Sequence, residues 1–200
     1  MDLKLASRKL YEQCFDEGKK YFVDYYYDTI IKRNEMVVAL DGDEIVSMIH
    51  LNPYIYNICG DIRKVHYLVA IATKVEYRNR GLMGKCLSKA IEYLDELEEP
   101  YCYLVPDNEE VENIYRKYGF EIVGKFTLDK FSNAEYDIFP DANEEYINLM
   151  KKEEYYLGME SKEYIDELKN KNVMFKVLKK CNGYNIDFFK EKQIYVCQEV

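Results

Sequence analysis

The feature that most constrains the fold is an amphipathic helix between two apolar β-type runs. The helix spans about residues 82–98, and its apolar side chains recur with the 3.6-residue period of an α-helix. One run, 65–73, precedes the helix, and the other, 101–105, follows Pro100. A strand, a helix and a strand in this order favour a parallel crossover, because both strands can then pair in one sheet with the helix on its face. The apolar stripe of the helix comprises Leu82, Met83, Cys86, Leu87, Ala90, Ile91, Leu94 and Leu97.

The residues before this crossover predict two helices and an antiparallel hairpin. The helices are expected at about 3–15 and 18–33, where apolar side chains have helical spacing. The runs 36–40 and 44–51 flank Asp41-Gly42, which is a strong signal for a tight β-hairpin. A separate strand is expected at 54–58, after Pro53, and it ends at a turn at Gly60-Asp61.

The residues after the crossover predict further helices and strands. Helices are expected at 109–118, 141–158 and 161–171, and strands at 120–127, 174–178 and 194–197. We therefore predict an α+β fold with a mixed, mostly antiparallel central sheet flanked by helices. We expect one domain over residues 1–130 and a C-terminal α/β extension, 131–200, packed on it.

Composition excludes several classes of protein. A chain of 200 residues can bury a sizeable core without metals or disulfides. The excess of 37 acidic over 28 basic residues argues against a general nucleic-acid binder. No run approaches the length of a membrane span and no apolar signal core is present, so we expect a cytoplasmic protein with no membrane partner. Six cysteines without a CxxC pair, and only two histidines, predict reduced thiols and no metal site.

The segment from Thr73 to Gly84 has the features of an anion site. It connects the apolar run 65–73 to the start of the amphipathic helix, where unpaired backbone N–H groups and the positive end of the helix dipole meet. Gly81 and Gly84 permit close approach of a ligand to the backbone, and Arg78 and Arg80 suit phosphate. The spacing differs from the dinucleotide-binding and P-loop motifs. An ordinary strand–helix connection with solvated arginines is the alternative.

The charge distribution favours the anion site. Residues 61–90 contain seven basic and two acidic residues, a net charge of +5, whereas the rest of the chain carries −14. Residues 91–112 contain nine acidic residues and no lysine or arginine. A cationic segment at a helix N-terminus of an acidic protein suits a small polyphosphate ligand.

Two motifs in this sequence resemble those of the GNAT superfamily of acetyl-CoA-dependent N-acyltransferases. In YRNRGLMG, Arg78 and Gly81 match the family pattern Q/R-x-x-G-x-G/A, and Met83 departs from its last position. The stretch 108–120 resembles the second signature, N-x-x-A-x-x-x-Y-x-x-x-G-F, with Val111 in place of Ala. The resemblance covers about residues 1–130. The sequence around motif A and the presence of the C-terminal extension most resemble the bacterial enhanced-intracellular-survival type of acetyltransferase.

The resemblance implies a GNAT-like fold, acetyl-CoA as cosubstrate and a role for each matching residue. Backbone groups at Ile71 and Thr73 would contact the pantetheine arm. Asn108 would contact the cofactor, and Tyr115 would protonate the departing thiolate. Tyr118 is the second candidate for this general acid. The residues that would surround the pyrophosphate are Arg78, Asn79, Arg80, Gly81, Leu82, Met83 and Gly84.

The sequence leaves more than one candidate for the general base. Many members of the family have a Glu on the strand before motif A, where this chain has Tyr67. A water chain, His66 or the terminal carboxylate of Val200 are the candidates, the last because the similar subgroup uses its C-terminus in this way.

The leading hypothesis is an N-acetyltransferase acting on a small cationic amine or a peptide amine. The alternative is a non-catalytic acyl-CoA-binding sensor or interaction module, motivated by Met83 and the missing Glu. Cysteine nucleophile chemistry at Cys102 or Cys86 with His66 is disfavoured, because apolar surroundings raise the pKa of a thiol. The extension could cover the acceptor cleft, form a homodimer or stabilise the first domain.

Overall fold

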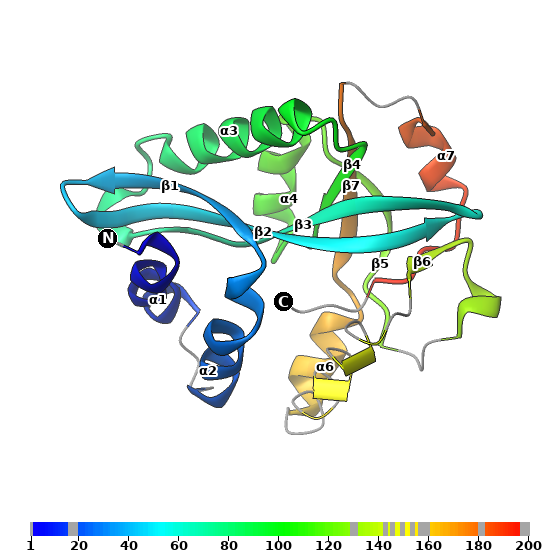
Figure 1. Cartoon of the computed structure of the whole chain (residues 1–200), viewed down its shortest axis with the longest axis horizontal. Helices are drawn as coiled ribbons and strands as arrows, with labels where there is room; N and C mark the ends of the chain where they lie inside the picture. Colours follow the sequence, from blue (N-terminus) through cyan, green and yellow to red (C-terminus); the bar gives the residue numbers. More distant parts are fainter. Residues whose placement is uncertain are drawn as a thin grey trace. The chain divides into compact units, whose positions relative to one another are not determined.

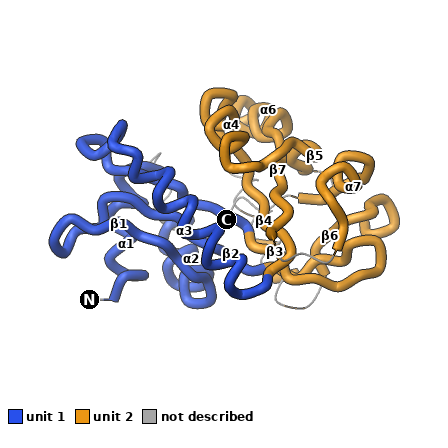
Figure 2. The backbone as a smooth tube through the Cα atoms, turned by 90° about the horizontal axis from the view of Figure 1, so that it is seen from above, with its two compact units in different colours: residues 1–53, 67–98, 200 blue, residues 54–66, 99–199 orange. Residues whose placement is uncertain are grey.

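The structure is a computed structural model that describes residues 2–15, 20–128, 132–141, 144, 147–148, 151–152, 155, 161–179 and 183–196. Its backbone divides into two compact units, coloured separately in Figure 2. Unit 1 comprises residues 1–53 and 67–98, and unit 2 comprises 54–66 and 99–199. The predicted boundary at residue 130 stays a prediction.

Unit 1 contains three longer helices and an edge strand (Figure 1). Its elements are α1 (Leu3–Cys14), α2 (Lys20–Asp28), η1 (Ile30–Lys32), β1 (Glu35–Asp41), η2 (Val75–Tyr77) and α3 (Leu82–Glu96). Two long strands, β2 (Glu44–Ile58) and β3 (Asp61–Thr73), contribute to both units. The remaining elements belong to unit 2: β4 (Tyr101–Leu104), α4 (Glu109–Arg116), β5 (Glu121–Lys125), η3 (Asn133–Glu135), β6 (Ile138–Pro140), α6 (Lys162–Leu168), β7 (Asn172–Val177) and α7 (Ile186–Lys190).

Hydrogen bonds join the strands into one sheet. The order is β1-β2-β3-β4-β7-β5, with β6 paired to β2. The pairs β1–β2, β2–β6, β4–β7 and β5–β7 are all antiparallel. The connection through α3 joins β3 and β4, which are neighbours in the sheet. The predicted α+β fold with a mostly antiparallel sheet and flanking helices is therefore confirmed.

The predicted break at Pro53 is wrong, since β2 continues from Glu44 to Ile58. Proline has no N–H to donate to a neighbouring strand, so it is tolerated where that edge is unpaired. Pairing with β1 ends at Leu51, opposite Glu35, and Pro53 lies beyond it. The hairpin between β1 and β2 is confirmed, with its turn at Gly42-Asp43.

The last part of the chain supplies an inner strand of unit 2. Strand β7 pairs with β4 on one side and with β5 on the other, so β4 and β5 do not pair with each other. The Phe175 ring of β7 stacks on Tyr103 at 5.3 Å between centroids and lies 5.1 Å from Phe189 of α7. Strand β6 and helix α7 were not predicted, and neither were the short helices η2 and η3. Most of the predicted helix 141–158 lies outside the described residues, as does Cys197. The predicted strand 194–197 is wrong over its described part, 194–196, where Ile194 forms only an isolated bridge with Ile138.

Helix α3 packs on unit 1 through the predicted stripe. Cys86, Leu87, Ala90 and Leu94 are buried, as the 3.6-residue period requires. Leu82, Met83 and Ile91 are half-buried, and Leu97, which lies just past the helix end, is 45% exposed.

Both histidines are buried and favour the neutral imidazole. Burial lowers the pKa of His66 to about 4, and the charge of Lys64 lowers it further in the same direction. Burial lowers the pKa of His50 to about 3, and its Nδ1 lies 2.8 Å from the Tyr26 hydroxyl. Each histidine therefore binds a proton more readily in the unfolded chain than in the folded protein.

We predict that the free energy of unfolding falls as the pH drops from about 6.5 towards 4. In this range the His66 imidazole binds a proton in the unfolded chain but stays neutral in the folded protein. His66 alone should contribute about 3 kcal/mol to this loss. Urea unfolding of the wild type and His66→Leu between pH 4.5 and 7.5 measures it. The variant should show a shallower dependence of stability on pH, and equal slopes for both proteins would contradict the prediction.

Gly119 follows helix α4 in the left-handed conformation, with φ +82°. A side chain there would strain the backbone, and its Cβ would lie 2.8 Å from Lys176 Nζ. We predict that Gly119→Ala lowers the free energy of unfolding by about 1–2 kcal/mol. Gly124→Ala in β5 is the matched control, because a Cβ at Gly124 meets nothing within 4 Å. Equal stability of the two variants in chemical denaturation would refute the role given to Gly119.

Candidate active site

The end of strand β3 is the first component of the candidate site. Ala70 has a left-handed backbone, with φ +51°, in the middle of the strand. This conformation turns the chain away from regular pairing, as in a β-bulge, just before Ile71. Ile71 and Thr73, the residues expected to offer backbone groups to a ligand, are partly exposed.

The Ser47 side chain holds the last residues of β3. Its Oγ lies 3.0 Å from the carbonyl oxygen of Ala72 and 2.8 Å from Thr73 Oγ1. The backbone N–H of Lys74 donates to the carbonyl of Val46 at 2.9 Å. The strand end is thus fixed to β2 by one backbone and two side-chain hydrogen bonds.

The loop between β3 and α3 brings its backbone to the start of the helix in a left-handed conformation. Asn79 has φ +61° and Gly81, the N-cap residue of α3, has φ +73°. Within the described part of the chain, no side chain caps this helix. The N–H groups of the first turn, Leu82 to Gly84, have no acceptor inside the helix and are available to an anion.

The cations nearest to this helix start are those that lack carboxylate partners. Arg63, Lys64, Lys74 and Lys89 form ion pairs with Asp61, Glu99, Glu44 and Glu92 respectively. By contrast, Arg78, Arg80 and Lys85 pair with no carboxylate among the described residues, and all three are exposed. Part of the +5 charge of residues 61–90 is therefore neutralised locally, and the unpaired part lies around the start of α3.

Arg78 and Arg80 are held in different ways. Arg78 Nε donates to the carbonyl oxygen of Thr73 at 3.1 Å, so its side chain ties the loop to the strand end. The guanidinium of Arg80 lies 4.8 Å from the centre of the Tyr77 ring, within the range of a cation–π contact. The Tyr77 hydroxyl in turn donates to Asp41 at 2.5 Å.

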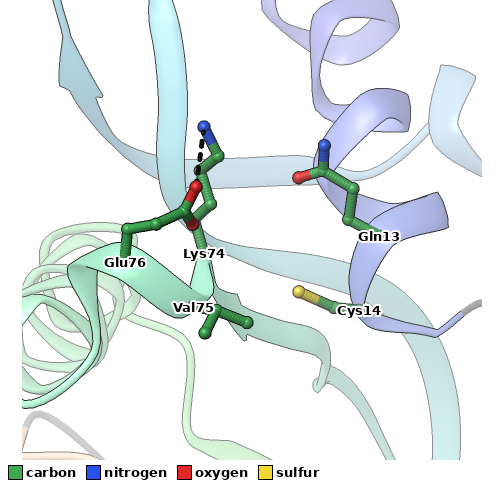
Figure 3. A pocket seen from close by; sticks show the side chains of 5 residues that line it. All are labelled: Gln13, Cys14, Lys74, Val75 and Glu76. Carbon is green, nitrogen blue, oxygen red and sulfur yellow. Dashed lines mark ion pairs between the residues drawn. The ribbon is translucent and has the colours of Figure 1, made fainter.

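A cavity of about 310 Å³ lies beside the strand end in unit 1 (Figure 3). It is lined by Gln13, Cys14, Lys74, Val75 and Glu76. The Lys74 ammonium lies 3.7 Å from the Glu76 carboxylate, the ion pair drawn in Figure 3. Burial raises the pKa of the Cys14 thiol, and the nearby Arg78 guanidinium opposes that shift. The cavity adjoins the loop but does not include residues 78–84.

The second motif forms helix α4 of unit 2. Asn108 is its N-cap, and Asn108 Oδ1 accepts a hydrogen bond from the N–H of Val111 at 3.1 Å. Glu112 is buried and accepts hydrogen bonds from Asn172 and Arg116. Although burial opposes its ionisation, these partners hold the pKa of Glu112 below its usual value. The helix is therefore fixed at its start and along one side.

Tyr115 lies on the buried face of α4 and is 5% exposed. Its ring packs against Phe120 with centroids 6.2 Å apart. No described residue forms a hydrogen bond with its hydroxyl. Burial raises the pKa of the Tyr115 phenol, and the charge of Asp107 raises it further. The phenol is thus protonated at neutral pH and has a proton to donate.

The predicted site residues fall into two groups. Ile71, Thr73 and residues 78–84 lie together in unit 1, in the strand, loop and first turn of α3. Asn108 and Tyr115 lie in unit 2, seven residues apart on α4 and its cap. Ser47 was not predicted; the only signal was a polar residue within the apolar strand sequence IVSMI.

The candidates for the general base have different surroundings. His66 is 1% exposed, and no described residue partners its Nδ1. Tyr67, at the position where many members of the family have a Glu, is 5% exposed. Val200 lies outside the described residues.

No helix in the described part of the chain is long and apolar enough to cross a membrane. The described residues also contain no group of three or more His, Cys, Asp or Glu side chains placed to bind a metal ion. Cys86 and Cys102 are both buried and neither forms a disulfide, and burial raises the pKa of the Cys86 thiol.

Solved structures with a similar fold come from several acetyltransferases. A probable N-acyltransferase from Enterococcus faecalis is 17% identical, with a TM-score of 0.55, and the match covers 60% of this chain and 30% of that one. A putative N-acetyltransferase from Lactobacillus plantarum is 14% identical, with a TM-score of 0.55, over 88% of this chain and 92% of that one. An aminoglycoside 6'-acetyltransferase type Ii is 16% identical, with a TM-score of 0.55, over 88% and 89%. These likenesses concern the fold.

Sequence comparison identifies the family. No curated protein matches the chain significantly. The model of the acetyltransferase (GNAT) domain matches residues 6–123, which include motif A and the second signature. The chain therefore belongs to the GNAT acetyltransferase family.

Proposed function

We propose that this protein is an acetyl-CoA-dependent N-acetyltransferase acting on a primary amine of a small cationic molecule or a peptide. The observation that carries the proposal is the start of α3, which is entered through left-handed Gly81 and which no described side chain caps. Three cations without carboxylate partners among the described residues flank it. Such a helix start suits a pyrophosphate. It lies within the match to the GNAT domain, whose members are acetyltransferases.

The proposed cofactor contacts follow from the exposed backbone of the site. The N–H groups of Leu82, Met83 and Gly84 would donate to the pyrophosphate, with Arg78 and Arg80 supplying positive charge. Backbone groups at Ile71 and Thr73 would position the pantetheine arm, and Asn108 would contact the cofactor from the start of α4. Met83 departs from the family pattern only in its side chain, whereas its N–H is retained.

Direct attack is the simplest chemistry for these groups. The neutral amine nitrogen forms a bond to the thioester carbonyl carbon, and the carbon–sulfur bond then breaks. The amine loses one proton to a base, and the thiolate of CoA gains one from an acid. The Tyr115 hydroxyl has no hydrogen-bond partner among the described residues, which supports its assignment as that acid. Water, His66 and the carboxylate of Val200 stay the candidates for the base.

The acidic remainder of the chain supports a cationic acceptor, because a negative field attracts a positively charged substrate. The aminoglycoside 6'-acetyltransferase with a similar fold offers one such class of amine. Aminoglycosides, polyamines and peptide amines are therefore the acceptors to test. Membership of the enhanced-intracellular-survival type stays a prediction.

The second candidate is a non-catalytic acyl-CoA-binding sensor or interaction module. Tyr67 favours it, since this buried residue occupies the position where many members of the family have a Glu. Thiol release from acetyl-CoA with a panel of amines separates the two functions. Binding of acetyl-CoA without turnover of any amine would support the sensor.

We predict that Tyr115→Phe lowers kcat by about 10²-fold or more while the KM for acetyl-CoA stays within about 2-fold. The reason is that only protonation of the departing sulfur is lost. Thiol release with an amine found in the panel measures both constants. Tyr101→Phe is the control, because it also removes a buried hydroxyl of unit 2. That hydroxyl accepts a hydrogen bond from the N–H of Tyr184 at 2.7 Å. The control variant should keep the kcat of the wild type. Unchanged turnover by Tyr115→Phe would reject the acid role.

We also predict that Arg80→Gln raises the Kd for acetyl-CoA about 5- to 10-fold at low salt, since an unpaired cation beside the phosphates is lost. The difference from wild type should shrink as salt screens the charge. Calorimetric titration at 20 and 300 mM NaCl tests this, because the screening length falls from about 20 Å to about 6 Å over this range. Lys169→Gln, an exposed change on the residue after α6, controls for net charge and should bind as wild type does.

A further inference from the structure

Four polar side chains form a hydrogen-bonded cluster in the core of unit 1, and none of them belongs to the candidate active site. They are Tyr26 of α2, Asn34 directly before β1, and His50 and Asn52 of β2. All four residues are 0% exposed. The ring of Tyr11 from α1 stacks on Tyr26 with centroids 5.2 Å apart and helps to enclose the cluster.

The Tyr26 hydroxyl joins the other three side chains. It lies 2.8 Å from His50 Nδ1 and accepts a hydrogen bond from Asn34 Nδ2 at 3.3 Å. It also lies 3.5 Å from Asn52 Oδ1, which accepts from Asn34 Nδ2 at 3.1 Å. The Asn34 amide thus uses both of its N–H groups inside the cluster.

Three polar atoms of the cluster have no hydrogen-bond partner among the described residues. They are Asn34 Oδ1, His50 Nε2 and Asn52 Nδ2, and all three are buried. Buried polar atoms in folded proteins are nearly always hydrogen-bonded, because the loss of water without a replacement partner costs free energy. Three such atoms on adjacent side chains point to a bound polar molecule.

The chemistry of the three atoms restricts what that molecule can be. Asn34 Oδ1 can only accept and Asn52 Nδ2 can only donate, so their partner has to do both. His50 Nε2 donates in one tautomer of the neutral ring and accepts in the other. A simple anion cannot donate to Asn34 Oδ1, and a metal cation cannot accept from Asn52 Nδ2.

Charge and space exclude further classes of ligand. The cluster contains no carboxylate, and the Lys4 ammonium donates to the backbone carbonyl of Asn34 at 2.6 Å, so a second cation beside it would be repelled. The complete burial of the four side chains requires a small molecule. Water fits all of these conditions, since internal waters make two to four hydrogen bonds to buried polar groups.

We propose that unit 1 binds an internal water molecule that donates to Asn34 Oδ1 and accepts from Asn52 Nδ2, with His50 Nε2 as its third partner. The site connects α2, the residue before β1, and β2, so the water is a structural ligand shared by three segments of unit 1. The proposal is independent of the proposed function, because it involves neither CoA nor an acceptor.

Oxygen-17 magnetic relaxation dispersion tests the proposal, since its amplitude counts the waters that stay bound while the protein tumbles. The double variant Asn34→Leu/Asn52→Leu replaces both amides by apolar groups of similar size, which avoids leaving one amide without its partner. Its amplitude should fall below that of the wild type by the contribution of one water. Met48→Leu is the matched control, because it also places a leucine at a fully buried position of β2 but removes no hydrogen bond of the cluster. Its amplitude should equal that of the wild type.

A crystal structure of the wild type is the second measurement and depends on no variant. It should show a water oxygen within about 3.2 Å of both Asn34 Oδ1 and Asn52 Nδ2. Equal amplitudes for the wild type and a folded double variant would overturn the proposal. Electron density without a water between the two amides, or with the three atoms paired to other side chains, would overturn it as well.

Discussion

The insertion of β7 between β4 and β5 is the interaction on which unit 2 depends. Helix α4, which carries Tyr115, lies between β4 and β5 in the chain, yet these strands do not pair with each other. Strand β7 satisfies the backbone of both, and Phe175 adds stacking against Tyr103. The position of α4 is therefore set by residues more than fifty positions further along the chain.

Much of the fold could be predicted from the sequence because its elements have clear periods. The stripe of α3, the hairpin at Asp41-Gly42 and the two motifs follow from local patterns, and all of these elements are present. The continuity of β2 through Pro53 could not be predicted, since it depends on where β1 stops pairing. Helix α7 has only five residues, too few for a periodic pattern to be distinctive.

The candidate site was predicted in part for a similar reason. Gly81 and the arginines could be predicted from the sequence. A glycine before a helix permits a left-handed backbone, and positive charge beside a helix start favours an anion. Among the described residues, ion pairs neutralise the other cations of the segment 61–90 and leave Arg78, Arg80 and Lys85 without carboxylate partners; several of these pairs join residues far apart in the chain and cannot be seen in the sequence. The role of Ser47 is also tertiary, since its partners Ala72 and Thr73 are about 25 positions away.

The place of β7 in the sheet also bears on the order in which the chain folds during synthesis. The described segments of unit 1 end at residue 98, so they leave the ribosome before most of unit 2. Strands β4 and β5 have to wait until residue 177 has emerged before their shared neighbour exists. Until then the backbone edges of β4 and β5 that will pair with β7 are unpaired. Unpaired strand edges of a nascent chain can bind chaperones or associate with the wrong strand.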